Sequence, residues 1–325
     1  MAVSRFSSGD RVADRRADYA SMLWDMGDRA AAIDLMADAL ALAPGWAPGW
    51  FRLGEMREET GELSGATEAW TEALRLEPCD RMGASLKLGL IGAAQGIEAA
   101  PAAFVETLFD QYADRFDVSL VEKLGYRVPD LIADALAGLG ASAFAHVVDL
   151  GCGTGLMGER LRGCASFLEG NDISRAMLRK AEAKRFYDRL DRVDLSVMAP
   201  GARRADLVVA ADVLIYLGAL ERIVSVVADM LKPDGLFAFS VELHDGPEPM
   251  VLRPSRRFAH APHHVRALLT RSGFDLLSIE ETELRRDRGE AVAGLILVAR
   301  RIASADAMEQ LDDPHAAVLG RSLVR

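Results

Sequence analysis

The segment Val147–Gly155, which reads VVDLGCGTG, restricts the fold of this chain more than any other. A short apolar run that ends on closely spaced glycines is typical of a buried parallel strand running into a loop. From this strand to about Arg301, strand-like and helix-like runs alternate. The alternation predicts βαβ units, and therefore a mainly parallel sheet with helices on its faces.

The end of this α/β region departs from the pattern. The last apolar run, Ala291–Val298, follows a polar, hairpin-like stretch, Arg285–Glu290. An antiparallel pairing of this run with Leu276–Glu280 would make the sheet mixed. No fold is assigned to the charged tail from Ser304 to Arg325.

The amino-terminal part contains an internal repeat. A shift of 34 residues superimposes Gly27 on Gly61 and Pro44 on Pro78. The pattern predicts two helices per unit, with the glycine in the turn between them and the proline after the second helix. In its period and its small and aromatic positions, such as Trp70, the repeat resembles the tetratricopeptide repeat.

Beyond the repeats the pattern stays helical up to Gly140, with Pro101 and Val128-Pro129 opening two segments. Two repeat units, 13–46 and 47–80, and a capping helix at 81–94 are expected before that. The predicted parts of the chain are a flexible start (1–12), helical repeats (13–96), a helical lid or linker (97–140), the α/β domain (141–302) and a tail (303–325).

Composition excludes several classes of protein. The formal net charge of −11, from 38 Lys and Arg against 49 Asp and Glu, argues against a protein that holds nucleic acid through its phosphates, although a local basic patch would still permit an RNA substrate. No run approaches the ~20 apolar residues of a membrane span, and the start has no signal-peptide core, so we expect a cytoplasmic protein. The three cysteines and six histidines lack metal-ligand spacing, and no metal is expected.

The glycine loop fits two kinds of cofactor. Gly153, Gly155 and Gly158 satisfy G-x-G-x-x-G, the pattern in which a loop and a helix start hold the pyrophosphate of a dinucleotide such as NAD. Asp149, at the strand end, would oppose that anion. S-adenosylmethionine instead carries a sulfonium and an ammonium, which a carboxylate attracts. The sequence therefore favours S-adenosylmethionine.

A second carboxylate, Asp172, follows the next strand-like run, Ser166–Asn171. At that position it can accept both ribose hydroxyls of either cofactor. The alternative is a solvated acid at the start of a helix, Arg175–Phe186, that Ser174 caps.

Four motifs carry a resemblance to a known family. They are the glycine loop, Gly170–Ala181 (GNDISRAMLRKA), Ala205–Tyr216 (ADLVVAADVLIY) and Leu231–Gly235 (LKPDG). Their types and order resemble the class I S-adenosylmethionine-dependent methyltransferases. With the repeats in front, the chain resembles bacterial predicted methyltransferases that carry tetratricopeptide repeats. The resemblance implies a Rossmann-like fold with a seven-stranded mixed sheet.

The resemblance also assigns cofactor-binding roles. Asp149 would face the methionine amino group, and three glycines, Gly151, Gly153 and Gly155, would line the methionine–ribose side. Asp172 would bind the ribose hydroxyls.

Three more residues complete the cofactor set that the resemblance implies. Ile173 would pack on the adenine, and Asp194 would meet the adenine amino group. Tyr112 lies in Phe109–Asp117, a segment that resembles the lid of small-molecule methyltransferases, where its hydroxyl could reach the methionine carboxylate and Arg115 could supply charge. The same aromatic residues also form an ordinary apolar helix stripe.

Catalytic candidates follow the fourth and fifth strands, where an open α/β sheet places its ligand crevice. Asp212 would lie beside the transferable methyl group, or else fix the local loop. His260 is the first choice for a base or acceptor contact, followed by Tyr216. Each is also a common kind of surface or capping residue, as are the further candidates Glu242, His244 and His263.

The expected function is methyl transfer to a small-molecule acceptor by in-line displacement. Alternatives are a protein methyltransferase whose substrate docks on the repeats, an NAD-dependent oxidoreductase, and a non-catalytic repeat scaffold. The repeats either pack on the catalytic domain or bind a protein partner or a second copy. Nucleic acid and membrane partners are not expected.

Overall fold

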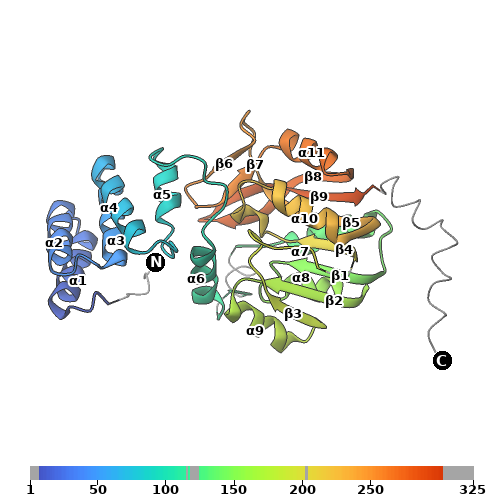
Figure 1. The fold of residues 1–325 in the computed structure, drawn as a ribbon, viewed down its shortest axis with the longest axis horizontal. Coiled ribbons are helices and arrows are strands. Elements are labelled where there is room, and N and C mark those ends of the chain that lie inside the picture. Colours follow the sequence, from blue (N-terminus) through green and yellow to red (C-terminus); the bar gives the residue numbers. More distant parts are fainter. Residues whose placement is uncertain (1–6, 115, 118–123, 202–203, 303–325) are drawn as a thin grey trace, which may run out of the picture.

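The computed structural model describes residues 7–114, 116–117, 124–201 and 204–302. A helical amino-terminal part and an α/β part with a large sheet lie next to each other along the long axis of the molecule (Figure 1). The predicted tail, Arg115 and the first half of the predicted start (1–6) lie outside the described residues. No helix within the described ranges is long and apolar enough to cross a membrane.

The amino-terminal part begins with two helix pairs, as the repeat predicts. Gly27 and Gly61, with φ angles of 90° and 82°, form the turn inside each pair, and the second helix of each pair ends two residues before a proline. The four helices are α1 (Arg11–Asp25), α2 (Arg29–Leu42), α3 (Ala47–Glu59) and α4 (Leu63–Leu76).

Helices α3 and α4 approach closely at Gly54. A Cβ atom on this residue would lie 2.3 Å from the indole nitrogen of Trp70, which is fully buried. The same nitrogen donates a hydrogen bond to the carbonyl of Phe51, 3.2 Å away. The small residue in one helix and the large one in the other are therefore fitted to each other.

The predicted capping helix corresponds to α5 (Ala84–Leu90), which is shorter than the predicted 81–94. Its start is fixed by Asp80, whose carboxylate accepts hydrogen bonds from the amides of Ala84 and Ser85. Because these bonds satisfy the free amides of the first turn, the helix begins only after Gly83.

Two further helices lead to the sheet. They are α6 (Ala102–Tyr112), which follows Pro101, and α7 (Val128–Gly138), which has Pro129 in its first turn, both as predicted. A buried cluster joins α5 and α6 to the α/β part through Leu86, Phe104, Tyr216 and Phe258.

The sheet contains nine strands, against seven predicted. The strands are β1 (Phe144–Leu150), β2 (Ala165–Asp172), β3 (Arg189–Arg192), β4 (Ala205–Ala210), β5 (Leu231–Leu243), β6 (Met250–Leu252), β7 (Phe258–His260), β8 (Phe274–Asp287) and β9 (Glu290–Arg301). Strands β3, β2, β1, β4 and β5 are parallel in that order, β9 pairs antiparallel with β5, and β8 pairs antiparallel with β9. These seven strands form the predicted mixed sheet.

The two extra strands, β6 and β7, form a short hairpin that pairs with the end of β5. Strand β4 reaches only Phe239 of β5, whereas β5 continues to Leu243, so the last residues of β5 extend beyond the parallel sheet. Strands of three residues leave no period in the sequence, which explains why the prediction missed them.

The hairpin also contacts the helical part. Arg256, in its turn, donates a hydrogen bond to the carbonyl of Met82 at 3.0 Å, and its guanidinium lies 4.6 Å from the ring centre of Phe104. The turn has a left-handed conformation at Arg256, with a φ of 61°. This contact joins the helical part to the α/β part.

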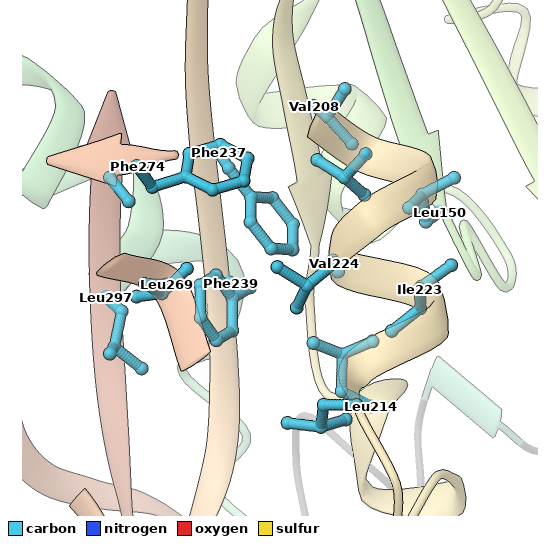
Figure 2. Packing of buried hydrophobic residues seen from close by; sticks show 14 of the residues in the cluster. Leu150, Val208, Leu214, Ile223, Val224, Phe237, Phe239, Leu269, Phe274 and Leu297 are labelled. Carbon is cyan, nitrogen blue, oxygen red and sulfur yellow. The ribbon is translucent and has the colours of Figure 1, made fainter. Parts of the chain in front are cut away.

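Apolar helices cover both faces of the sheet. The helix α10 (Glu221–Met230) packs on β1, β4 and β5 through residues such as Ile223 and Val224, and α11 (Pro262–Arg271) extends the same layer (Figure 2). On the other face, α7 and α8 (Leu156–Leu161) pack on alternate residues of the same strands, such as Val147. This two-sided burial explains the unbroken apolar runs in the sequence.

Candidate functional site

The glycine loop connects β1 to α8. Gly151, Gly153 and Gly155 have φ angles of 67°, 55° and 92°, in the left-handed region that glycine adopts without strain. A Cβ on Gly151 would lie 2.3 Å from the side chain of Val213, so packing as well as conformation demands glycine there. At Gly153, the ring of Phe116 is the only described group within 4 Å of the Cβ position, at 3.8 Å, so a ligand can approach the backbone here.

Asp149 lies at the end of β1 and is fully buried. Its Oδ2 accepts a hydrogen bond of 2.6 Å from the hydroxyl of Tyr187, and its Oδ1 has no hydrogen-bond partner among the described residues. Burial raises the pKa of the Asp149 carboxyl to about 7, and the nearby Asp172 adds to this effect. The site thus holds a buried acceptor oxygen that lacks a donor, which is costly unless a ligand supplies one.

Tyr187 is a residue that the sequence prediction missed. Its ring fills a slot between three glycines, because a Cβ on Gly158, Gly170 or Gly155 would lie 2.4, 2.8 or 3.1 Å from it. Gly158, the third glycine of the G-x-G-x-x-G pattern, therefore makes room for this ring. The sequence contains only one sign of such a slot. Two glycines at the start of α8 and one in β2 stand at positions that the apolar pattern of these elements does not explain.

Asp172 ends β2 and accepts hydrogen bonds from the backbone of the glycine loop and from the backbone at the start of α9. One of its oxygens accepts from the amide of Gly153 at 2.9 Å, and the other from the amide of Ser174 at 2.8 Å. Burial raises the pKa of its carboxyl to about 6. The Ser174 hydroxyl caps α9 (Arg175–Lys184), as predicted, although the helix ends two residues early.

The remaining predicted cofactor residues lie near this strand end. Ile173 follows Asp172 and is half-buried, and Asp194 comes two residues after β3, which pairs with β2. The Asp194 carboxylate accepts from the amide and hydroxyl of Ser196 at 2.9 and 2.6 Å. Asp194 and Asp172 thus follow neighbouring parallel strands at the same edge of the sheet.

Helix α6 and the residues after it contact the glycine loop and the start of α9. Asp110 accepts a hydrogen bond of 2.5 Å from the hydroxyl of Ser174, and Asp117 binds Thr154 and Lys184. Tyr112, the last residue of α6, is half-buried. These hydrogen bonds tie the segment that was predicted as a lid to the glycine loop and to α9, and closure over a cofactor stays a prediction.

A buried ion cluster follows β4 and β5. Arg285 donates 2.6 Å hydrogen bonds to both carboxylate oxygens of Asp212 and a further bond to Glu242. The side chains of Arg285 and Glu242 are each only 2% exposed. Asp212 also has a φ of 56°, and its amide donates to the hydroxyl of Ser240. These contacts agree with the alternative that Asp212 fixes its own loop.

Arg285 was expected in a polar hairpin, and the structure corrects this. Strand β8 continues to Asp287, and the turn to β9 contains only Arg288 and Gly289, both with positive φ. Between Glu283 and Arg285 the pairing register shifts by one residue, a β-bulge. The bulge turns Arg285 inward beside the buried Leu284.

His260, the first choice for a base or acceptor contact, lies where an acceptor does not reach it. The residue is fully buried in β7, and its Nε2 lies 3.0 and 3.1 Å from the carbonyls of Leu217 and Gly218. Its Nδ1 is also buried. Burial lowers the pKa of the imidazole to about 4, so the ring is neutral and donates to these carbonyls. His260 thereby ties β7 to the loop before α10.

The other candidates are dispersed. Tyr216 is buried after β4, and its ring meets that of the lid residue Phe109 edge-on at 5.5 Å. His244 pairs with Glu248 at 3.0 Å, and His263 is exposed on α11. Within the described ranges no group of three or more His, Cys, Asp or Glu is placed to hold a metal ion.

A surface depression of the described residues lies elsewhere. It is lined by residues at the amino-terminal ends of β5 and β8, including Asp234 and Phe274, at the opposite edge of the sheet from Glu242. It therefore takes no part in this site.

Comparison with known proteins identifies the α/β part. Residues 148–237, from β1 into β5, match the family model described as a methyltransferase domain. This part of the chain is a methyltransferase domain. The glycine loop, Asp172 and Asp212 all fall inside the matched segment of the methyltransferase domain.

Two curated relatives also match. The malonyl-(acyl-carrier protein) O-methyltransferase of Enterobacter lignolyticus is 30% identical over 145 residues, which cover 44% of this chain and 57% of that protein. The ubiquinone biosynthesis O-methyltransferase of Coxiella burnetii is 27% identical over 99 residues, which cover 29% of this chain and 42% of that protein. The chain thus spans about half the length of the curated relatives it matches.

Among solved structures, that of the cyclase SpnF shares the fold. It aligns with a TM-score of 0.53 and 17% identity, over 65% of this chain and 100% of that one. The alignment supports a Rossmann-like methyltransferase fold with a mixed sheet.

Proposed function

We propose that the protein is an S-adenosylmethionine-dependent methyltransferase that acts on a small-molecule acceptor. The unpartnered Oδ1 of Asp149 carries this proposal, because it is a buried acceptor oxygen at the end of β1 inside a methyltransferase domain. The methionine ammonium of the cofactor is a donor of matching charge. Two relatives named as O-methyltransferases agree with this chemistry.

The rest of the site fits the same cofactor. Asp172 is held by two backbone amides and retains acceptor capacity for the ribose hydroxyls. Ile173 and Asp194, at the same edge of the sheet, would then contact the adenine, and Tyr112 the methionine carboxylate. We assign no pyrophosphate to the loop, because the slot at Gly158 is filled by Tyr187 and an anion would face Asp149.

S-adenosylmethionine, once bound, would supply a methyl group on a sulfonium, and an acceptor atom would take this methyl in line as S-adenosylhomocysteine leaves. The chain's residues contribute alignment and exclusion of water. Phe116 covers the loop at Gly153, and Phe109 closes against Tyr216. The acceptor would lie beside Tyr216, beneath α6.

The test is a calorimetric titration of the purified protein with S-adenosylhomocysteine and, separately, with NADH. We expect binding of the first alone. Asp149→Ala should lose most of the affinity, because it removes the carboxylate that meets the ammonium. Asp134→Ala, at an exposed acid on α7, is the matched control and should bind as the wild type does.

Binding of NADH in place of S-adenosylhomocysteine would contradict the proposal, as would unchanged affinity in Asp149→Ala. Turnover of S-adenosylmethionine with a panel of metabolites then separates an enzyme from a non-catalytic scaffold. A protein acceptor in place of a small molecule would appear as methylation of lysate proteins.

We also propose that α1 to α4 are two tetratricopeptide-like repeats. The 34-residue spacing of Gly27 and Gly61, and the fit of Gly54 to Trp70, support this assignment. Binding of a protein partner or a second copy through the repeats remains a prediction.

A further inference from the structure

Two hydrogen bonds, which share the hydroxyl of Tyr187, connect the start of α8 to Asp149. The amide of Gly158 donates to the hydroxyl of Tyr187 at 3.1 Å, and this hydroxyl donates to Oδ2 of Asp149 at 2.6 Å. Helix α8 begins after Gly155, which has no side chain to cap the free amides of the first turn. The Tyr187 hydroxyl therefore takes the place of an N-cap side chain for Gly158.

The ring of Tyr187 is fixed as firmly as its hydroxyl. It lies in the slot between Gly155, Gly158 and Gly170, where a Cβ on any of the three would lie between 2.4 and 3.1 Å from the ring. The fixed ring sets the position of the hydroxyl, and the hydroxyl in turn fixes the rotation of the Asp149 carboxylate. With Oδ2 engaged, Oδ1 is the oxygen that remains for a ligand.

We infer that Tyr187 is a positioning residue for cofactor binding, which holds the Asp149 carboxylate so that its free oxygen meets the methionine ammonium. This inference rests on the proposed function. It also gives the third glycine of the loop pattern a role in this chain, which is to admit the tyrosine ring.

The same hydrogen bond governs the charge of Asp149. Burial raises the pKa of this carboxyl to about 7, and the bond from Tyr187 opposes the rise. The other titratable groups around it are Asp172, Cys152 and Tyr126, and burial raises the pKa of each of them. Because the ionised carboxylate binds the ammonium, affinity should increase as the pH rises through about 7. Loss of the Tyr187 hydroxyl should move this increase to higher pH.

The experiment measures binding of S-adenosylhomocysteine by calorimetry between about pH 5.5 and 8.5. Tyr187→Phe keeps the ring in its slot and removes only the hydroxyl. We expect its Kd at pH 7 to rise about tenfold, the usual effect of losing a hydrogen bond to a charged group, and the difference to shrink at the highest pH. Comparison at each pH cancels the titration of the ligand itself.

Two controls separate positioning from general damage. Tyr126→Phe removes another buried hydroxyl, 3.5 Å from the carbonyl of Ala211, and should leave the pH profile unchanged. In an Asp149→Asn background, Tyr187→Phe should change the Kd less than about twofold, since a positioning residue acts through its partner. An equal loss of affinity at every pH, or an undiminished loss in that background, overturns the inference.

A measurement without cofactor distinguishes failure of this inference from failure of the proposed function. Carbon NMR of labelled aspartate follows the titration of Asp149, whose pKa should be higher in Tyr187→Phe than in the wild type. In the wild type, the Tyr187 hydroxyl proton should exchange with water far more slowly than that of Tyr19, which is 62% exposed. An unshifted pKa of Asp149 or fast exchange of the Tyr187 hydroxyl proton would contradict the inference. Failure of the wild-type protein to bind S-adenosylhomocysteine would instead contradict the proposed function.

Discussion

At the scale of single residues, the ion cluster after β4 and β5 is the most consequential feature for stability. Arg285 pairs with two carboxylates, Asp212 and Glu242, that the fold largely removes from water, and Arg253 lies 3.9 Å from Glu242. A buried ion pair gains little over apolar packing, but removal of one partner leaves charges buried without compensation. The cluster is therefore sensitive to a single substitution.

Arg285→Met should lower the free energy of unfolding by about 3–5 kcal/mol, the usual cost of breaking a buried pair. Urea denaturation at pH 7 measures this change. The adjacent Arg286, whose side chain is 58% exposed, provides the control, and Arg286→Met should stay within about 0.5 kcal/mol of the wild type. Equal effects of the two substitutions would show that the cluster contributes no more than a surface pair.

The sequence predicted some of these residues and missed others for physical reasons. Asp149 and Asp172 were predictable because each comes at the end of an apolar strand beside the glycine loop or a capped helix. Arg285 was not, because a β-bulge inverts the direction of one side chain without any change in residue pattern. Tyr187 follows a helix as an ordinary aromatic residue, and only three-dimensional packing shows the slot that holds it.

At the scale of elements, the contact of α3 with α4 depends on one missing side chain. Gly54→Ala would place a methyl group 2.3 Å from the indole of Trp70. We expect a loss of about 1–3 kcal/mol, as for overpacking of other tight cores. Thermal or urea unfolding measures it. Gly45 lies in the same helical part with nothing within 4 Å of its Cβ position, and Gly45→Ala should leave stability unchanged.

Long elements were predictable and short ones were not. The helix pairs, the β1 strand and the antiparallel β8–β9 pair follow from periodicity and turn residues over many positions. The β6–β7 hairpin has three residues in each strand. It can pair with the end of β5 because β5 extends beyond the last residue that pairs with β4. His260 was misread for this reason, since a residue expected in a loop lies in a buried strand.

At the scale of the whole molecule, the helical part and the methyltransferase domain are joined through Arg256. Arg256→Ala removes its hydrogen bond to Met82 and its contact with the Phe104 ring. These two contacts together are worth about 1 kcal/mol or more, so local opening should become several-fold more frequent. Hydrogen exchange should accelerate in α5 and in residues 250–260.

Ser255→Ala, at the exposed neighbouring position, provides the comparison and should exchange as the wild type does. Faster exchange spread evenly over the chain would mean that Arg256 supports overall stability and not this joint.

Helix α6 belongs to both parts of the molecule. Its first half shares a buried cluster with α5, and Asp110 in its second half accepts a hydrogen bond from Ser174 at the start of α9. A ligand that binds beneath α6 would therefore act on a helix that also packs against α5. A chain shortened to residues 97–302 would lack the α5 side of this cluster, so α6 would lose one of the two surfaces that hold it over the carboxyl ends of the strands.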